Sequence, residues 1–192
     1  MALERQMNVL FPTTFFLKYE IPNFVQLLEL HEKYVTKESN TDFEWNIYCN
    51  VKTSSIPIEE ALPVIKPSLE LLSKDIGSFE FTMFDPWANT YGKGSYQEVH
   101  DHSENDIAAV FFLNQGYDFG EFYIKDRFSP LLSAQMKKQL GYTDCVRSSD
   151  VNIQKGEVIF FPGHVLHGVT PHLSDVDRKT IAVNVNIVSG RQ

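Results

Sequence analysis

The stretch EVIFFPGHVLHGVTPHLSDVDRKTIAVNVNI, residues 157–187, decides the fold that the sequence predicts. It holds an apolar run at Val158–Phe161, a turn at Pro162–Gly163, and a longer apolar run that begins near Arg178. Both runs are rich in Val, Ile or Phe, which favour pleated strands. The stretch is therefore predicted to form buried strands joined by turns.

The same pattern of strand-forming runs and turn residues extends back to Phe79. Short runs rich in Val, Ile, Phe, Tyr and Thr are separated by Gly, Asn, Asp or Pro; they include FEFTMFDPWANTY, IAAVFFLN, GEFYIKD and KTIAVNVNIV. This spacing is typical of an all-β sandwich or barrel. One segment, SPLLSAQMKKQLGYTD at residues 129–144, looks helical. It is predicted to be a crossing insert near the barrel mouth, where it would shape a binding site.

The first 78 residues are predicted to be mostly helical, with some strand. Residues 8–19 indicate a strand, and residues 21–35 have the apolar spacing of an amphipathic helix. Residues 57–76 indicate one or two helices, broken near Pro63 or Pro67 because proline lacks the N–H that a helix interior needs. These helices would support the strands from outside.

Length and composition indicate an ordinary globular protein. With 192 residues, 43% hydrophobic and 22% charged, the chain is predicted to be a single domain over residues 1–192. Residues 1–78 would be an N-terminal buttress and residues 79–188 the β core. The net charge of -8 and the lack of a basic stripe argue against nucleic acid as a partner.

The cysteines and the lengths of the apolar runs predict the cellular compartment of the protein. Cys49 and Cys145 form no CxxC motif or zinc-like spacing, and two isolated cysteines fit a reducing compartment. No signal peptide is evident, and no run reaches about 18 apolar residues. We expect a cytoplasmic protein that does not span a membrane. The sequence does not indicate an oligomeric state.

Histidines indicate a metal site. In YQEVHDHSENDIAAVFF, residues 96–112, His100 and His102 lie two apart, so in a strand both would point from one face. His167 follows in a separate strand. Imidazoles from two strands suit a facial triad that leaves open positions on non-haem Fe(II). The other histidines are predicted to lie at the surface: His31 on a helix, and His164 and His172 in loops. The alternative for one of these two loop histidines is a role in supporting the metal ligands or in gating the entrance.

Arg178 and Thr180 share one face of the last strand. An Arg inside an apolar strand is costly unless it meets an anion. One interpretation is a salt bridge to a core carboxylate. The other is a clamp for the carboxylate of a small molecule, with the Thr180 hydroxyl as second donor.

The chain resembles the Fe(II)- and 2-oxoglutarate-dependent oxygenases. More narrowly, it is similar to a small group of 2OG-Fe(II) oxygenases of marine bacteria and phages. The resemblance covers about residues 79–187 well and the N-terminal part loosely. It is carried by the stretches LFPTTFF, WANTYGKGSYQEVHDH, IAAVFFLN, GEFYIKDRF and GEVIFFPGHVLHGVTPHLSDVDRKTIAVNVN.

This resemblance implies a mainly β fold, the double-stranded β-helix or cupin-like jelly roll, with flanking N-terminal helices. It implies a dioxygenase, in particular a hydroxylase, that uses Fe(II), 2-oxoglutarate and O₂ on a small-molecule or peptidyl substrate. The iron ligands would include His100 and His167. Arg178, assisted by Thr180, would hold the far carboxylate of 2-oxoglutarate.

Two further residues are candidates for the co-substrate pocket. Tyr91 matches a Tyr that contacts the co-substrate in prolyl hydroxylases, and Asn89 shares its strand parity. The chain departs from the superfamily at His102, where an Asp is usual. The expected ligand set is therefore His100, His102 and His167, with Glu104 as an alternative third ligand.

Two other functions remain open from the residues alone. One is a metal-binding, cupin-like jelly roll without 2-oxoglutarate chemistry, acting as a binding or structural module. The other is a cupin-type enzyme that uses oxygen without 2-oxoglutarate. The Arg178-x-Thr180 pair favours the 2-oxoglutarate oxygenase, since the other two have no need of a carboxylate clamp.

Overall fold

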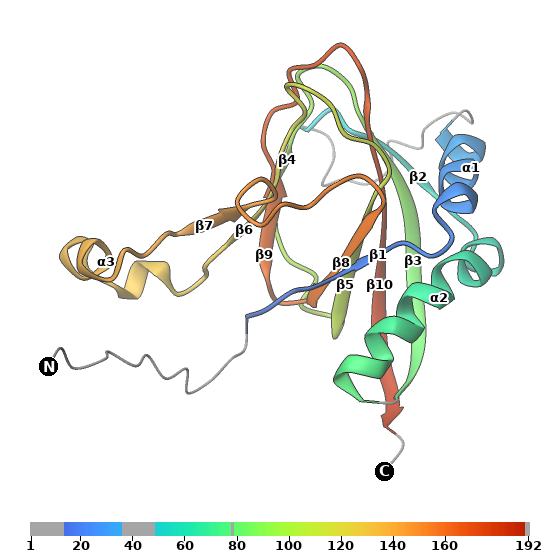
Figure 1. The fold of residues 1–192 in the computed structure, drawn as a ribbon, viewed down its shortest axis with the longest axis horizontal. Helices are drawn as coiled ribbons and strands as arrows, with labels where there is room; N and C mark the ends of the chain where they lie inside the picture. Colours follow the sequence, from blue (N-terminus) through green and yellow to red (C-terminus); the bar gives the residue numbers. More distant parts are fainter. Residues whose placement is uncertain (1–13, 36–48, 78, 191–192) are drawn as a thin grey trace, which may run out of the picture.

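The computed structural model describes residues 14–35, 49–77 and 79–190, and it consists of two β-sheets with helices against one of them (Figure 1). The N-terminal part of the strand predicted at residues 8–19 lies outside the described residues. The elements in chain order are β1 (Leu17–Glu20), α1 (Phe24–Val35), β2 (Lys52–Ser55), α2 (Ile58–Ile76), β3 (Phe79–Tyr91), β4 (Gln97–His100), β5 (Ile107–Phe112), β6 (Phe122–Lys125), a 3-10 helix (Ser129–Leu131), α3 (Ala134–Leu140), β7 (Cys145–Arg147), β8 (Glu157–Pro162), β9 (Leu166–Val169) and β10 (Arg178–Gly190).

The strands form an antiparallel jelly roll. The larger sheet has the order β1-β8-β5-β10-β3-β2, and the smaller has the order β4-β9-β6-β7. Neighbours such as β5 and β10 are distant in sequence, so the chain crosses repeatedly between the sheets. The predicted mainly β, double-stranded β-helix fold is confirmed.

Strand β10 lies inside the larger sheet between β3 and β5. Its register places Arg178 opposite Tyr91, and Thr180 opposite both Asn89 and Phe112. Residues that are far apart in sequence thus become neighbours on adjacent strands. The face of this sheet that is turned toward the smaller sheet carries the candidate co-substrate residues.

Helices α1 and α2 cover the outer face of the larger sheet (Figure 1). The prediction of a break in α2 is wrong, because the helix continues through Pro63 and Pro67. Pro63 is exposed, while Ile65 and Leu69 are fully buried on the inner face. Burial of that apolar face outweighs the lost backbone hydrogen bonds. None of the described helices is long and apolar enough to cross a membrane.

His31 lies on the buried face of α1, so its prediction as a surface residue is wrong. Its side chain is fully buried, and its Nε2 lies 3.0 Å from the backbone oxygen of Asn89 in β3. His31 falls four residues after Leu27, which is also fully buried. The helical spacing therefore contained the correct signal.

Residues 125–147 form an arm that projects from the barrel between β6 and β7 and carries α3 (Figure 1). The predicted helical character of this insert is confirmed. The predicted crossing of the barrel mouth is wrong, since only the base of the arm lies at the barrel and α3 extends away from it. The reason is that α3 buries no residue, so nothing draws it onto the body.

Candidate metal and co-substrate site

Three histidines from two separate parts of the chain, His100 and His102 from one and His167 from the other, converge between the sheets. One ring nitrogen from each of His100, His102 and His167 lies within 4.8 Å of the others. The ring centroids are 4.3 Å apart for His100 and His167, and about 5 Å apart for the other two pairs, at 5.1 and 5.2 Å. In the described part of the chain, this is the one such group of three or more potential metal ligands.

The convergence has a different local cause from the one predicted. His100 ends β4 and pairs with His167 of β9, but His102 lies beyond the strand in a loop. The His102 backbone N–H donates to the oxygen of Gly163, 2.7 Å away. Strand alternation therefore does not aim His102; the turn between β8 and β9 fixes its position.

Two of the three imidazoles are oriented by backbone oxygens. Nδ1 of His100 lies 2.8 Å from the oxygen of Glu98, and Nδ1 of His167 lies 2.9 Å from the oxygen of Val165. A carbonyl oxygen only accepts, so Nδ1 carries the proton in both rings. Each Nε2 is left with a lone pair, as a metal ligand requires.

The imidazoles are held uncharged. Burial lowers the pKa of His100, and burial together with the nearby His100 lowers the pKa of His102 to about 4. Burial lowers the pKa of His167 well below its usual value. Protons therefore compete little for the ring lone pairs at neutral pH, which favours binding of a metal cation.

Arg178 lies in the same pocket as the histidines. Its side chain is 4% exposed, and its guanidinium carbon lies 4.8 Å from the ring centre of Tyr91 and 5.7 Å from that of Phe112. Nη1 is buried and has no hydrogen-bond partner. Within the described ranges no carboxylate is within ion-pair distance of Arg178. The described residues therefore contain no carboxylate that would form the salt bridge with Arg178 considered as the alternative interpretation.

Thr180 and Asn89 also line this pocket and are buried. The Oδ1 of Asn89 accepts a hydrogen bond from the Thr53 hydroxyl at 2.9 Å, and its backbone oxygen is 3.0 Å from His31. Contacts with Thr53 and His31 thus fix the position of Asn89. The predicted clamp residues and the three histidines line one cavity.

Sequence reasoning left three polar or aromatic lining residues without a clear role. Gln97 is buried in the pocket wall, although its parity differs from that of His100. Trp87 lies with its ring centre 5.8 Å from that of His102. Asn184 lines the pocket, and its Oδ1 is buried without a hydrogen-bond partner.

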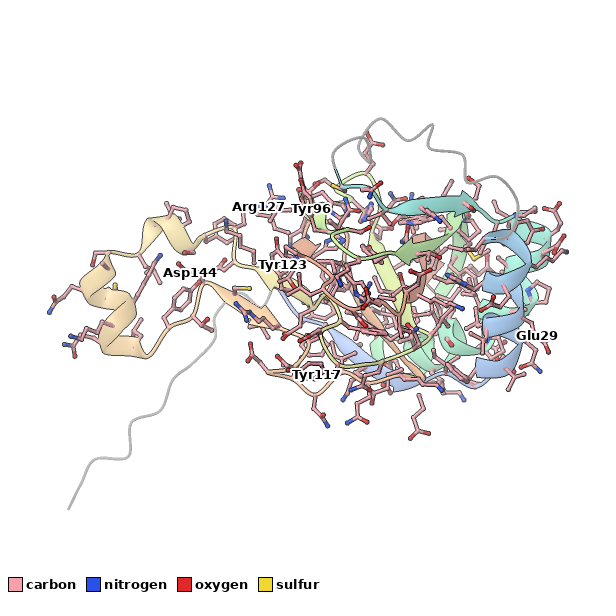
Figure 2. All side chains as sticks on the ribbon, turned by 90° about the horizontal axis from the view of Figure 1, so that it is seen from above. Glu29, Tyr96, Tyr117, Tyr123, Arg127 and Asp144 are labelled. Atoms are coloured by element: carbon pink, nitrogen blue, oxygen red, sulfur yellow. The ribbon has the colours of Figure 1, made fainter. Side chains whose placement is uncertain are left out.

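Glu104 is exposed and lies outside the histidine group. Arg127 pairs with Asp101 and donates to the backbone oxygen of His164 at 3.0 Å. Figure 2 shows Arg127 where the arm meets the body, with Asp144 farther out. The arm base is therefore tied to the loop that carries His102.

His164 is exposed, as predicted. The surface prediction for His172 is wrong, because its side chain is fully buried. Its Nδ1 accepts from the N–H of Gly120 at 3.1 Å, and its Nε2 lies 2.8 Å from the oxygen of Val176. A single histidine here satisfies backbone groups of two loops, a role that its loop position alone does not reveal.

Comparison with known proteins agrees with this geometry. The family described as "Putative 2OG-Fe(II) oxygenase" matches residues 85–184, just over half of the chain. No curated protein matches the chain significantly.

Solved structures share the fold. A prolyl-4-hydroxylase from Pseudomonas putida has 16% identity and a TM-score of 0.60, with 91% of this chain and 93% of that chain covered. The viral collagen prolyl hydroxylase of Paramecium Bursaria Chlorella virus-1, in its 2-oxoglutarate complex, has 13% identity and a TM-score of 0.59, covering 91% and 96%. HygX from Streptomyces hygroscopicus, with nickel and 2-oxoglutarate bound, has 13% identity and a TM-score of 0.62, covering 92% and 84%.

The jelly roll and the family match define a non-haem iron dioxygenase that depends on 2-oxoglutarate and O₂. The chain belongs to the family of 2OG-Fe(II) oxygenases.

Proposed function

We propose that this oxygenase is a hydroxylase of a small-molecule or peptidyl substrate and that His100, His102 and His167 hold its iron. The observation that carries the proposal is one pocket with three convergent, uncharged imidazoles and a buried guanidinium without a carboxylate partner. Neutral nitrogen ligands suit Fe(II). The unpaired Arg178 suits a dicarboxylate such as 2-oxoglutarate, so the residues present fit both groups.

In this proposal the far carboxylate of 2-oxoglutarate lies against Arg178 and Thr180. The fork of the guanidinium would donate two parallel hydrogen bonds, and the Thr180 hydroxyl a third. Tyr91 lies beneath the guanidinium and limits its rotation, while Asn89 forms the neighbouring wall. The keto acid end would then point along the pocket toward the three histidines.

Bound iron would supply the activation of O₂, coupled to the oxidation of 2-oxoglutarate to succinate and CO₂. The chain itself supplies orientation and exclusion of water. Backbone oxygens hold the Nε2 atoms of His100 and His167 ready as ligands. Phe122 and Phe161 pack around the ring of His167 and keep that side of the pocket apolar.

The third histidine changes the charge of the site. An Asp ligand would cancel one positive charge of the metal, whereas His102 cancels none. A more positive centre favours a dianionic co-substrate, in addition to the contribution of Arg178. The ligand set thus supports binding of 2-oxoglutarate.

Support for the substrate class comes from the structural neighbours. Those with this fold include a prolyl hydroxylase of Trichoplax adhaerens in complex with a peptide fragment of hypoxia inducible factor. They also include the carbocyclase SnoK of nogalamycin biosynthesis. The fold therefore accommodates both peptides and small molecules. Asn184, with its unpaired Oδ1 beside His102, offers an acceptor to a substrate donor group.

Titration calorimetry tests the co-substrate proposal. Protein loaded with Mn(II) should bind 2-oxoglutarate, and Arg178→Lys should weaken that binding by about tenfold or more, because lysine lacks the planar fork. Metal content should stay near that of the parent. Arg147→Lys, a change at an exposed arginine, should leave both measurements unchanged.

Succinate formation without added substrate should be slow but measurable in the iron-loaded parent and lost in Arg178→Lys. If the metal-loaded parent binds no 2-oxoglutarate, the proposed clamp is wrong and the residues would fit a metal-binding, cupin-like module.

A further inference from the structure

We propose that the arm of one molecule docks into an apolar groove on a second copy of this chain, and that the contact is reciprocal. The arm is residues 125–147. The groove lies between the end of α2 and strands β5, β8 and β10, and its lining includes Phe15, Ile76, Ile107 and Ile187. This inference does not depend on the proposed catalytic function.

The arm is a formed structure that lacks a core of its own. The Ser133 hydroxyl accepts from the N–H of Met136 at 3.2 Å and caps α3. Lys137 pairs with Asp144 at 3.0 Å and also donates to the Ser129 hydroxyl at 2.7 Å. These contacts shape the arm from within, but they bury none of the residues of α3.

Four large apolar side chains of the arm are exposed. Leu131 is 80% exposed, Phe128 is 54% exposed, and Met136 and Leu140 are each 50% exposed. A seven-residue helix is marginal in water without packing of an apolar face. Several large apolar side chains gathered on one projection mark a protein interaction site.

The groove offers a complementary surface on the body. Three of its apolar lining residues, Phe15, Ile76 and Ile187, are between 40% and 46% exposed. Asp106 lies in its wall, and Asp75 precedes Ile76 at its edge. The groove is therefore apolar with acidic groups beside it.

The opposite charges of the arm and the rest of the chain favour the arm of a second copy as the partner of the groove. The arm has five basic and two acidic residues, a net charge of +3. The whole chain carries -8, so the rest of it carries -11. A basic, apolar arm and an acidic, apolar groove on the same chain allow two molecules to exchange arms across a twofold axis.

The arm does not reach the groove of its own molecule. Both views place α3 on the side of the barrel opposite to α1 and α2 (Figures 1 and 2). The base of the arm is anchored by the contacts of Arg127 with Asp101 and His164. In this proposal, a contact between two molecules covers both the apolar side chains of the arm and the apolar groove.

Sedimentation velocity of the full chain tests this proposal. We expect a dimer, and we expect its dissociation constant to rise with salt because the two surfaces carry opposite charge. An arm variant, Leu131→Glu with Met136→Glu, and a groove variant, Ile76→Lys, should each weaken the dimer by at least about tenfold. Val25→Lys, at a 61% exposed position on α1, is the control and should not.

Mixing the two disrupted variants gives the decisive result. The arm variant keeps an intact groove and the groove variant keeps an intact arm, so one contact can re-form and a heterodimer should appear. Circular dichroism would show that each variant is folded. Any of three results overturns the proposal: a monomeric parent, a dimer unaffected by either variant, or no heterodimer on mixing. A monomeric parent that binds an acidic peptide through the arm would assign the arm to a different polypeptide instead.

Discussion

Arg178 is the residue whose surroundings most constrain the chemistry of this protein. Burial lowers the pKa of its guanidinium, with Tyr91 acting in the opposite direction. A buried charge without an anionic partner costs free energy that a bound anion would recover. The ligand-free protein should therefore be less stable than the same protein with an anion bound to Arg178.

This argument predicts an unusual response to Arg178→Met. Because the change removes a buried charge that has no carboxylate partner, the free energy of unfolding of the ligand-free protein should stay equal or rise by about 1–3 kcal/mol. The stabilisation that 2-oxoglutarate gives the parent should disappear. Urea denaturation with and without 2-oxoglutarate measures both effects, and Arg147→Met serves as the exposed control. A loss of more than about 2 kcal/mol in the ligand-free state would show that Arg178 is already compensated.

The third metal ligand can be identified by a pair of variants. His102→Ala should lower the affinity for Fe(II) or Mn(II) sharply, because it removes one of the three convergent nitrogens. Glu104→Ala should have little effect, since the Glu104 side chain is exposed and outside the group. Metal content after anaerobic gel filtration compares the two. The ligand set is wrong if Glu104→Ala is the more damaging change.

At the scale of elements, the loop between β4 and β5 places His102. Its partner is the turn between β8 and β9, where Gly163 accepts from the N–H of His102 and donates to the oxygen of Asp106 at 3.0 Å. The side-chain Oδ1 of Asn186 in β10 accepts from the N–H of Asp106 at 2.9 Å. Two elements distant in sequence thus fasten this loop.

Gly163 is predicted to be essential for that fastening. A Cβ added to Gly163 would lie 2.5 Å from the oxygen of His102 and closer still to that of Asn105, so the backbone of the loop must move. Gly163→Ala should destabilise the protein by about 1–3 kcal/mol and weaken metal binding, although it changes no ligand.

Thermal unfolding and a metal titration measure the two effects. Gly92→Ala is the control, because its nearest atom, Oδ1 of Asp177, would be at an ordinary 3.6 Å. Normal metal affinity in Gly163→Ala would mean that the loop does not set the position of His102.

At the scale of the whole molecule, buried neutral histidines should make the fold sensitive to acid. Burial lowers the pKa of His31, as it does for the three site histidines. Below about pH 6.5 the unfolded chain therefore binds protons that the folded chain does not, and stability decreases as the pH falls. Above that pH the contribution is fully present.

The slope should reach about 1.4 kcal/mol per pH unit for each proton taken up on unfolding. Urea midpoints of metal-free protein between pH 8 and pH 5 measure it. His31→Gln should reduce this slope by the contribution of one proton, because glutamine does not titrate. Equal stability at pH 7 and pH 5 would contradict the prediction.

The domain boundary stays a prediction at this scale. The sequence divides the chain into a buttress at residues 1–78 and a core at residues 79–188, within one domain. Helices α1 and α2 do pack on the larger sheet, as a buttress would. The strand-like pattern after Phe79 predicted the mainly β architecture correctly, because alternation and turn residues are local properties of the chain, whereas the jelly roll was implied by the family resemblance.

Some features of the site could also be predicted locally. The runs around His100 and His167 and the Arg178-x-Thr180 pair indicated which side chains meet in one cavity. What failed was the geometry: His102 is aimed by a turn rather than by strand parity, and α2 continues through two prolines. His31 and His172 are buried because other elements pack over them.

The sequence by itself determined the strand-forming runs, the residue types of the site and the family, since each depends on neighbouring residues or on local motifs. The tertiary structure alone decided which backbone oxygens orient the imidazoles and which partners Arg178 lacks. It also decided that the arm projects with its apolar side chains uncovered. These properties arise from contacts between segments far apart in the chain, where packing and desolvation outweigh local preference.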